Sequence, residues 1–228
     1  MRGREQFSDH KKIFLFDLDG TLTDPAIGII ACTRFALEEL NRRCPKDESL
    51  IAFIGPPLRE MFSNLLNSSD KVLIEDAVRL YRERYSAIGI YEAQLYSGIP
   101  GMLERASRAA AAMFVVTSKA TVFAERAVAT FEIAHHFRRV YGAELDGRFD
   151  NKADLLRHML ALERIDPANA VMIGDRAGDI FGASANGIPG IGVLWGYGSE
   201  RELRHAGARA LYDTPDALAD GLSRNLAL

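Results

Sequence analysis

The feature of this sequence that most constrains its fold is a short apolar run, Ile13–Phe16, which ends abruptly in the acidic segment Asp17–Thr23. Four consecutive apolar residues bounded by a turn are typical of a strand that is buried on both faces. Gly20 within the acidic segment suits a tight loop. The pattern therefore predicts a central strand whose C-terminal end carries two carboxylates, Asp17 and Asp19.

Similar apolar runs recur along the rest of the chain and alternate with helical stretches. The runs cover Ala112–Val116, Ala170–Ile173 and Ile191–Leu194, and helices are expected at Met102–Ala110, Thr121–Phe131, Lys152–Leu162 and Asp179–Asn186. Thr214 and Pro215 are expected to open a last helix, as an N-cap and a first-turn proline. Strands that alternate with helices predict an α/β fold, with a parallel sheet covered by helices on both faces.

The segment from residue 24 to residue 97 breaks this alternation. Helices are predicted there at Pro25–Leu40, Leu58–Leu66 and Lys71–Ala87, with no strand between the last two. Gly98–Gly101 then punctuates the chain before the alternation of helices and strands begins. We therefore expect a core domain formed by residues 1–23 and 98–228, and a helical cap domain formed by residues 24–97.

Charge and composition exclude several classes of protein. The net charge of -3 over 228 residues argues against a non-specific nucleic-acid binder. No apolar run approaches the roughly 20 residues that span a bilayer, and Met1–Lys12 is too polar for a secretory signal, so a tail before the first strand is expected there. Cys32 and Cys44 have no metal-binding or CxxC context, which favours free thiols in a reducing cytoplasm. The sequence gives no indication of the oligomeric state.

Polar residues follow three of the predicted strands, at the edge of the sheet where ligands bind in open parallel sheets. Because the carboxyl ends of parallel strands meet at one edge, these residues are expected to lie together. They are Asp17 and Asp19 after the first strand, Thr117, Ser118 and Lys119 after the second, and Asp175 and Asp179 after the third, with Lys152 at the start of the preceding helix.

The segment Phe16–Leu22 resembles the signature loop of the haloacid dehalogenase-like (HAD) hydrolases. Thr117, Lys152 and the pair Asp175 and Asp179 match the second, third and fourth motifs of that superfamily, in the right order. The resemblance runs from about Lys12 to the C-terminus and implies a Rossmann-like core with an inserted α-helical cap. The branch that the chain resembles most is that of phosphoglycolate phosphatases and 5'-nucleotidases, on the segments Ile54–Leu58, Val116–Lys119 and Val193–Gly198.

This resemblance implies a magnesium-dependent phosphatase, and the chemistry of the residues agrees. A phosphate monoester repels a bare carboxylate, and a divalent cation removes that conflict. Asp17, Asp19 and Asp175 offer the hard oxygen ligands that Mg²⁺ prefers, and the resemblance implies that Asp19 binds through its backbone carbonyl. Asp17 is expected to attack phosphorus and form an aspartyl-phosphate. Asp19 is expected to protonate the leaving group and then to deprotonate the hydrolytic water.

The other motif residues are expected to bind and neutralise the phosphoryl group. Thr117 is expected to hydrogen-bond a phosphoryl oxygen together with the backbone near Ser118. Lys152 is expected to neutralise the nucleophile and the transferred group, a role for which Lys119 competes.

Three further residues are expected around the motifs. Asp179 and Thr21 are expected behind the direct ligands, where Asp179 orients metal-bound water or Lys152. Arg59 lies where caps of this type often place a residue that contacts substrate, although a solvated helix arginine is an equal interpretation.

Several reactions are compatible with such a scaffold. Asp19 argues against a dehalogenase, which needs no acid there, and the cap lysines Lys46 and Lys71 have no context that would indicate a phosphonate-cleaving enzyme. A sugar phosphomutase stays open. A receiver-like signalling module is disfavoured, because such modules are about half this length and have no cap. Among substrates, phosphoglycolate, a nucleoside 5'-monophosphate and a sugar phosphate are expected in that order.

Overall fold

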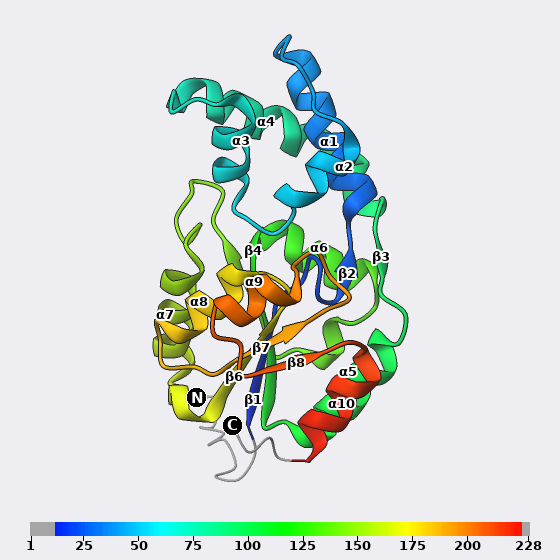
Figure 1. Ribbon diagram of the computed structural model, residues 1–228, viewed down its shortest axis with the longest axis vertical. Coiled ribbons are helices and arrows are strands. Elements are labelled where there is room, and N and C mark those ends of the chain that lie inside the picture. The colour runs from blue at the N-terminus through cyan, green and yellow to red at the C-terminus, as the bar shows by residue number, and fades with distance from the viewer. Residues whose placement is uncertain (1–11, 225–228) are drawn as a thin grey trace, which may run out of the picture.

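A six-stranded parallel sheet forms the centre of the computed structural model, which describes residues 12–224. The tail expected over Met1–Lys12 falls almost entirely on residues 1–11, outside the described residues. The strands lie in the order β5-β4-β1-β6-β7-β8 (Figure 1). They are β1 (Ile13–Phe16), β4 (Ala112–Ala120), β5 (Arg139–Ala143), β6 (Ala170–Gly174), β7 (Gly190–Val193) and β8 (Ala210–Tyr212).

The order of these strands fixes where a ligand can bind. Numbered along the chain, the six strands run 3-2-1-4-5-6 across the sheet, which is the order of doubly wound nucleotide-binding folds. The connections reverse direction at β1, which pairs in parallel with β4 on one side and with β6 on the other. Phe16, the last residue of β1, is in register with Val115 and Ile173. The crevice of such a sheet therefore lies at the C-terminal end of β1, directly before Asp17.

Helices cover both faces of the sheet, because alternate residues of β1 point to opposite faces. Phe14 and Phe16 pack in one core cluster with residues of α5, α6 and α10, and Ile13 and Leu15 pack in another with residues of α7 and α8. The helices of this part are α5 (Ile99–Ala109), α6 (Thr121–Thr130), α7 (Lys152–Glu163), α8 (Ala177–Ser184), α9 (Glu200–His205) and α10 (Pro215–Ser223). The predicted α/β sheet with helices on both faces is confirmed.

Four helices form a separate layer above the C-terminal edge of the sheet, at the opposite end of the molecule from α10 (Figure 1). We call them the cap. They pack around a core of their own that includes Ile29, Phe62 and Tyr81. The helices are α1 (Ala26–Glu39), α2 (Asp47–Leu50), α3 (Leu58–Leu66) and α4 (Lys71–Ala87).

A two-stranded ribbon carries the chain into and out of the cap. It consists of β2 (Thr23–Asp24) and β3 (Gln94–Leu95), which pair antiparallel, Thr23 with Leu95 and Asp24 with Gln94. Sequence analysis did not predict these strands, since two residues are too few to show any periodicity. The ribbon places the two ends of the helical segment side by side.

The structure differs from the sequence expectations at the edges of the sheet. β5 and β8 were not predicted, because edge strands are short and partly exposed and so lack the continuous apolar run of a central strand. β4 continues past Val116 to Ala120, with a shift of register against β5 between those two residues. Thr117, Ser118 and Lys119 therefore lie in an irregular extension of β4 and not after the end of the strand, where they were expected.

Within residues 12–224, no helix combines the length and the apolar character needed to cross a membrane. Cys32 and Cys44 are both free thiols, as expected.

Candidate active site

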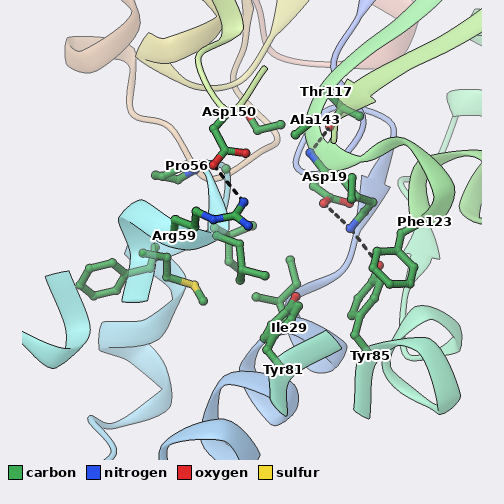
Figure 2. A pocket seen from close by; sticks show the side chains of 18 of the residues that line it. Asp19, Ile29, Pro56, Arg59, Tyr81, Tyr85, Thr117, Phe123, Ala143 and Asp150 are labelled. Carbon is green, nitrogen blue, oxygen red and sulfur yellow. Dashed lines mark hydrogen bonds and ion pairs between the residues drawn. The ribbon is translucent and has the colours of Figure 1, made fainter. Parts of the chain in front are cut away.

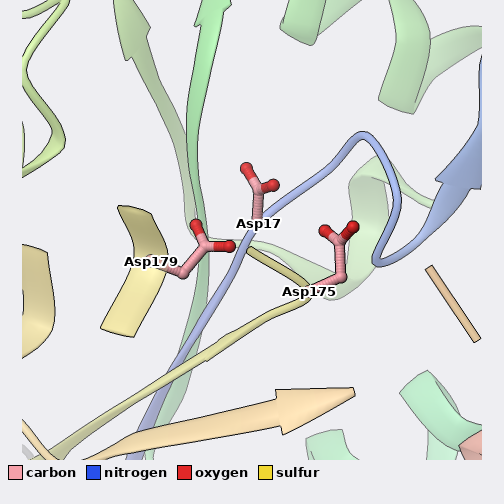
Figure 3. Close-up of side chains that lie close together, drawn as sticks. All are labelled: Asp17, Asp175 and Asp179. Atoms are coloured by element: carbon pink, nitrogen blue, oxygen red, sulfur yellow. The ribbon is translucent and has the colours of Figure 1, made fainter. Parts of the chain in front are cut away.

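Three aspartates meet at the C-terminal ends of β1 and β6. Asp17 follows β1, Asp175 follows β6, and Asp179 lies in the first turn of α8. All three are buried, and one carboxylate oxygen from each lies within 4.8 Å of the others (Figure 3). Like charges this close repel one another strongly, so the group needs a cation to stay ionised.

Asp175 is held by two loops from distant parts of the sequence. Thr21 Oγ1 donates to its Oδ1 at 3.1 Å, and the backbone N–H of Tyr197 donates to its Oδ2 at 2.9 Å. Burial, followed by the charges of Asp179 and Asp17, raises the pKa of Asp175 well above that of an ordinary aspartate. Asp175 is thus fixed in place but uncompensated in charge, as expected for a metal ligand.

Lys152 provides the positive charge beside the acids. Its Nζ lies 2.9 Å from Asp17 Oδ1 and also forms an ion pair with Asp179 Oδ1. Burial alone would lower the pKa of Lys152, but the carboxylates of Asp17 and Asp179 raise it above its usual value. Lys152 is therefore a cation in contact with the predicted nucleophile, and the structure brings the two together as the sequence predicted.

Asp179 uses both of its carboxylate oxygens within the protein. Its Oδ1 forms the ion pair with Lys152, and its Oδ2 accepts a hydrogen bond of 3.0 Å from the backbone N–H of Arg176. Burial raises the pKa of Asp179, and the charge of Lys152 opposes that rise. These contacts suit a residue that orients Lys152, which is one of the two roles predicted for it.

The residues present fit a magnesium ion. Asp17 Oδ1 is buried and accepts no hydrogen bond from residues 12–224, although Lys152 Nζ lies 2.9 Å away as an ion-pair partner. The Asp17 and Asp175 carboxylates converge and provide the hard oxygen donors that Mg²⁺ prefers. The contribution of the Asp19 backbone carbonyl stays a prediction.

The side chain of Asp19 lies apart from this acidic group. Its Oδ2 lies 2.5 Å from Lys119 Nζ, and its Oδ1 accepts a hydrogen bond of 3.3 Å from Thr23. Lys119 Nζ also donates to the hydroxyl oxygen of Tyr85 on α4, at 2.8 Å. Burial would lower the pKa of Lys119, but Asp19 and Tyr85 raise it above its usual value. The two lysines thus divide the cationic role, with Lys152 next to Asp17 and Lys119 next to Asp19.

Thr117 and Ser118 line the same cavity as Asp17 and Asp19. Thr117 is buried, and its Oγ1 accepts a hydrogen bond of 3.3 Å from the backbone N–H of Lys119. The Thr117 hydroxyl proton is therefore left to donate to a ligand.

A pocket lies between the cap and the edge of the sheet (Figure 2). Its core side carries the groups for chemistry, and its cap side carries apolar and aromatic side chains with two arginines. The core side includes Asp17, Asp19, Thr117, Ser118, Lys119, Phe123 and Asp150, and the cap side includes Ile29, Phe53, Met61, Tyr81, Tyr85, Arg59 and Arg82.

Arg59, predicted to contact substrate, lies in the wall of this pocket (Figure 2). Its guanidinium is paired with Glu75 on α4 and with Asp150, at 3.2 Å, in the loop between β5 and α7. It also donates to the carbonyl of Leu145 at 2.8 Å. A contact of Arg59 with substrate stays a prediction, and the structure adds a contact between cap and core.

The segment 195–198, which is part of the stretch Val193–Gly198 that carries the resemblance to phosphoglycolate phosphatases and 5'-nucleotidases, lies against the candidate active site. Trp195 Nε1 donates to the carbonyl of Thr21 at 2.9 Å, and the Tyr197 hydroxyl donates to Asp24 Oδ1 at 2.5 Å. A Cβ on Gly196 would collide with the Gly20 carbonyl, and one on Gly198 with the Asp175 carbonyl. Backbone is packed so closely here that only glycine fits.

Sequence reasoning did not identify Tyr85, Arg82 or Asp150 as residues of the site. Tyr85 and Arg82 lie inside the helical pattern of α4, where nothing distinguishes them from core and surface positions. Only the placement of the cap over the sheet brings them to the pocket.

Comparisons with known proteins agree with this geometry. The sequence profile described as haloacid dehalogenase-like hydrolase matches residues 14–193. A 5'-nucleotidase of Pseudomonas aeruginosa is 44% identical over 190 residues, which cover 83% of this chain and 86% of that protein. A tyrosine-protein kinase, PtkA, of Mycobacterium tuberculosis is 39% identical over 82% of this chain, which spans only 63% of the length of that kinase.

A solved structure gives the same result for the fold. The crystal structure of a predicted phosphatase from Clostridium acetobutylicum superposes with a TM-score of 0.89 at 35% identity, covering 94% of this chain and 99% of that one. The profile match spans the first, second, third and fourth motifs, and the structural match spans both the sheet and the cap. This chain therefore belongs to the haloacid dehalogenase-like hydrolase family.

Proposed function

We propose that this hydrolase is a magnesium-dependent phosphatase that cleaves small phosphate monoesters through an aspartyl-phosphate on Asp17. The observation that carries the proposal is Asp17 Oδ1, a buried carboxylate oxygen at the end of the central strand that accepts no hydrogen bond from the described part of the chain. It lies between a lysine and two further acids, and Asp17 lines the pocket beneath the cap. The phosphatase class itself follows from the family and from relatives with phosphatase names.

Asp17 is the nucleophile of the proposed reaction. Its oxygen attacks phosphorus, the bond to the ester oxygen breaks, and the phosphoryl group is transferred to the carboxylate. Thr117 donates its hydroxyl proton to a phosphoryl oxygen, and Lys152 offsets the negative charge that gathers around the group. Water then attacks the phosphorus of the aspartyl-phosphate and releases inorganic phosphate.

Asp19 moves the protons in both half-reactions. It gives a proton to the leaving alkoxide in the first step and takes one from the attacking water in the second. Its carboxylate is tied to Lys119 and Thr23. Release of at least one of these contacts therefore accompanies substrate binding.

Asp17, Asp175 and the backbone carbonyl of Asp19 would hold the magnesium ion. When bound, the ion supplies positive charge that lets a carboxylate and a phosphate approach each other. Asp17, Asp175 and Asp179, the three acids drawn in Figure 3, are all buried. Their burial supports the binding of a cation, since buried like charges are otherwise unfavourable.

The proposed substrates are phosphoglycolate, a nucleoside 5'-monophosphate or a sugar phosphate. The 5'-nucleotidase among the relatives supports the second of these. The aromatic side chains of the pocket, Phe53, Tyr81, Tyr85 and Phe123, also suit a flat ring.

The proposal is tested by phosphate release from a panel of small esters, with Mg²⁺ and with a chelator. Magnesium-dependent release is expected from at least one ester. Conversion of a hexose 1-phosphate to its 6-phosphate without net release would identify a phosphomutase instead. Incubation with ATP and a tyrosine peptide distinguishes the kinase activity that the name of PtkA states for that relative.

Asp17→Asn is the matched variant for the same assay. It is expected to abolish release and to leave the melting temperature equal or higher, because one charge leaves a group of three acids. Asp154→Asn, at an exposed position in the first turn of α7, serves as the control and is expected to keep full activity. Wild-type rates in Asp17→Asn would remove the covalent mechanism.

A further inference from the structure

Two arginines of the cap line the pocket, and their surroundings differ. Arg59 on α3 is engaged on all sides: its Nε and Nη2 donate to Glu75, its Nη1 donates to Asp150, and its Nη2 also reaches the Leu145 carbonyl. Two carboxylates thus meet one guanidinium. Arg59 has little capacity left for a ligand and serves to hold the cap on the loop between β5 and α7.

Arg82 on α4 is used far less. Its Nη1 donates to the same Leu145 carbonyl, at 2.9 Å, while its Nε is buried and has no hydrogen-bond partner in the part of the chain that the structure describes. Within residues 12–224, no carboxylate lies within ion-pair distance of it. Burial, followed by the charge of Arg59, lowers the pKa of Arg82, and the charges of Glu75 and Asp150 oppose that fall, so the guanidinium remains a cation at physiological pH.

A buried guanidinium N–H without a partner is unfavourable in a protein, so the Nε of Arg82 calls for an explanation in the ligand-bound state. The cap side of the pocket includes Ile29, Phe53 and Met61, which carry no oxygen acceptor, and the Asp150 carboxylate in the same wall is paired with Arg59. A site that leaves donors unpaired until substrate arrives discriminates strongly between substrates with and without the matching acceptor.

The pocket sets the direction of a bound ester. A phosphoryl group at Asp17 and Thr117 lies at the core side, so the leaving group extends along the apolar walls toward the cap. Its far end then reaches the wall that carries Arg82. A guanidinium fork pairs best with a planar oxygen acceptor, such as a carboxylate or a ring carbonyl.

We propose that Arg82 is the specificity-determining residue of this pocket, and that it donates hydrogen bonds to a planar oxygen acceptor on the leaving group, at the end away from phosphorus. The proposal rests on the proposed phosphatase function and deepens it. A carboxylate, as in phosphoglycolate, and a ring carbonyl, as in a nucleoside 5'-monophosphate, share this chemistry.

The test compares wild type with Arg82→Gln on four esters under steady-state conditions. Phosphoglycolate and uridine 5'-monophosphate carry the acceptor, and phenyl phosphate and glycerol phosphate lack it. The value of kcat/KM is expected to fall by about 10- to 100-fold for the preferred acceptor-bearing ester and by less than about 3-fold for phenyl phosphate. The ester that responds most tells whether the acceptor is a carboxylate or a carbonyl.

Two further variants make the result specific. Arg82→Lys keeps the charge but loses the fork, so an intermediate loss is expected for the same ester. Arg79→Gln changes an arginine on the same helix whose side chain is 63% exposed, and it is expected to leave all four values unchanged. Melting temperatures of all variants are compared first, and Arg82→Lys carries the test if Arg82→Gln is unfolded.

A binding experiment separates this proposal from the proposed function. Affinities of the four esters are measured by calorimetry for Asp17→Asn and for Asp17→Asn with Arg82→Gln. A selective loss for acceptor-bearing esters supports the proposal even if turnover proves to be something other than hydrolysis. Equal losses for all four esters, no loss for any, or no binding of any ester to Asp17→Asn would overturn it, whereas the phosphatase function fails only if wild type releases no phosphate.

Discussion

Lys119 Nζ lies 2.5 Å from Asp19 Oδ2 and 2.8 Å from the hydroxyl oxygen of Tyr85. This lysine, whose side chain is 8% exposed, therefore joins the proposed acid-base residue of the core to helix α4 of the cap (Figure 2). The ammonium also lies 4.7 Å from the centre of the Tyr85 ring, within range of a cation–π contact. Any movement of the cap changes the surroundings of Lys119, and through them the position of the Asp19 carboxylate.

Tyr85→Phe tests this connection, since it removes the hydroxyl and keeps the ring. We expect kcat to fall by about 3- to 10-fold with little change in KM, because the Asp19 carboxylate loses orientation while the pocket keeps its shape. In Lys119→Gln we expect a larger fall of kcat, by about 100-fold. Steady-state kinetics on the best ester measure both effects.

Tyr91→Phe provides the control, because that tyrosine is 60% exposed and its hydroxyl contacts Arg126 away from Asp19. It should match wild type. A rise of KM alone in Tyr85→Phe would mean that the tyrosine only binds substrate.

Glycine is required at position 196 because backbone and side-chain atoms surround it. A Cβ there would meet the Gly20 carbonyl and the side chain of Asp175. Gly196→Ala should therefore lower the free energy of unfolding by about 3 kcal/mol and cut activity. Gly101→Ala in α5, where a Cβ would meet nothing within 4 Å, should instead raise it by up to about 1 kcal/mol. Chemical denaturation measures both, and equal effects would contradict the close approach.

Removal of the metal should destabilise the protein. Mg²⁺ binds the folded acids only, so an excess of 100-fold over its Kd should stabilise the fold by about 2.7 kcal/mol relative to a chelated sample. Asp175→Asn should abolish most of this gain, because it removes one carboxylate of the group in Figure 3. A magnesium titration followed by thermal melting shows the effect, and an unchanged gain in Asp175→Asn would exclude that aspartate as a ligand.

The stability of the cap should depend on pH through Glu92. Arg84 on α4 donates to both of its oxygens, at 2.7 and 3.0 Å, and these hydrogen bonds lower the pKa of Glu92. A carboxylate with a lowered pKa stabilises the folded state above its ordinary pKa of 4.5 and loses that effect as the pH falls through the lowered value. Glu92→Gln should thus cost about 1 kcal/mol at pH 7.

The cost of Glu92→Gln should vanish in acid, where wild-type Glu92 is itself protonated. Denaturation of both proteins between pH 2 and pH 8 measures the difference. A cost that does not change with pH would show that the pair acts through packing and not through charge.

The local sequence was enough to predict the central strand and the acids that follow it. Ile13–Phe16 is apolar throughout because both faces of β1 are covered, and this is the condition under which a run of residues shows a strand most clearly. The bounds of α3 and α4 were also predicted correctly, since each helix has a regular pattern and a clear start.

The parts that depend on tertiary placement could not be predicted. The contact of Lys119 with Tyr85 joins residues 34 positions apart across the boundary of the cap. Arg79 and Arg82 both lie in α4, and only the packing of that helix against the rest of the protein gives their side chains different surroundings. The sequence pointed to Arg59, which is held by Glu75 and Asp150. Which arginine is left with unused donors depends on those neighbours, and no pattern in the chain reveals it.

The pairing of β2 with β3 has a consequence for how such a protein can change. The chain passes from the ribbon into the cap after Asp24 and returns to the ribbon at Gln94, and these two residues are direct partners across the ribbon. A short turn could therefore replace everything between them, or a foreign helical unit could be spliced in, without moving the strand ends that carry Asp17 and Asp175. Substrate recognition can therefore change through exchange of the cap, by natural selection or by protein engineering, while the residues at the strand ends stay in place.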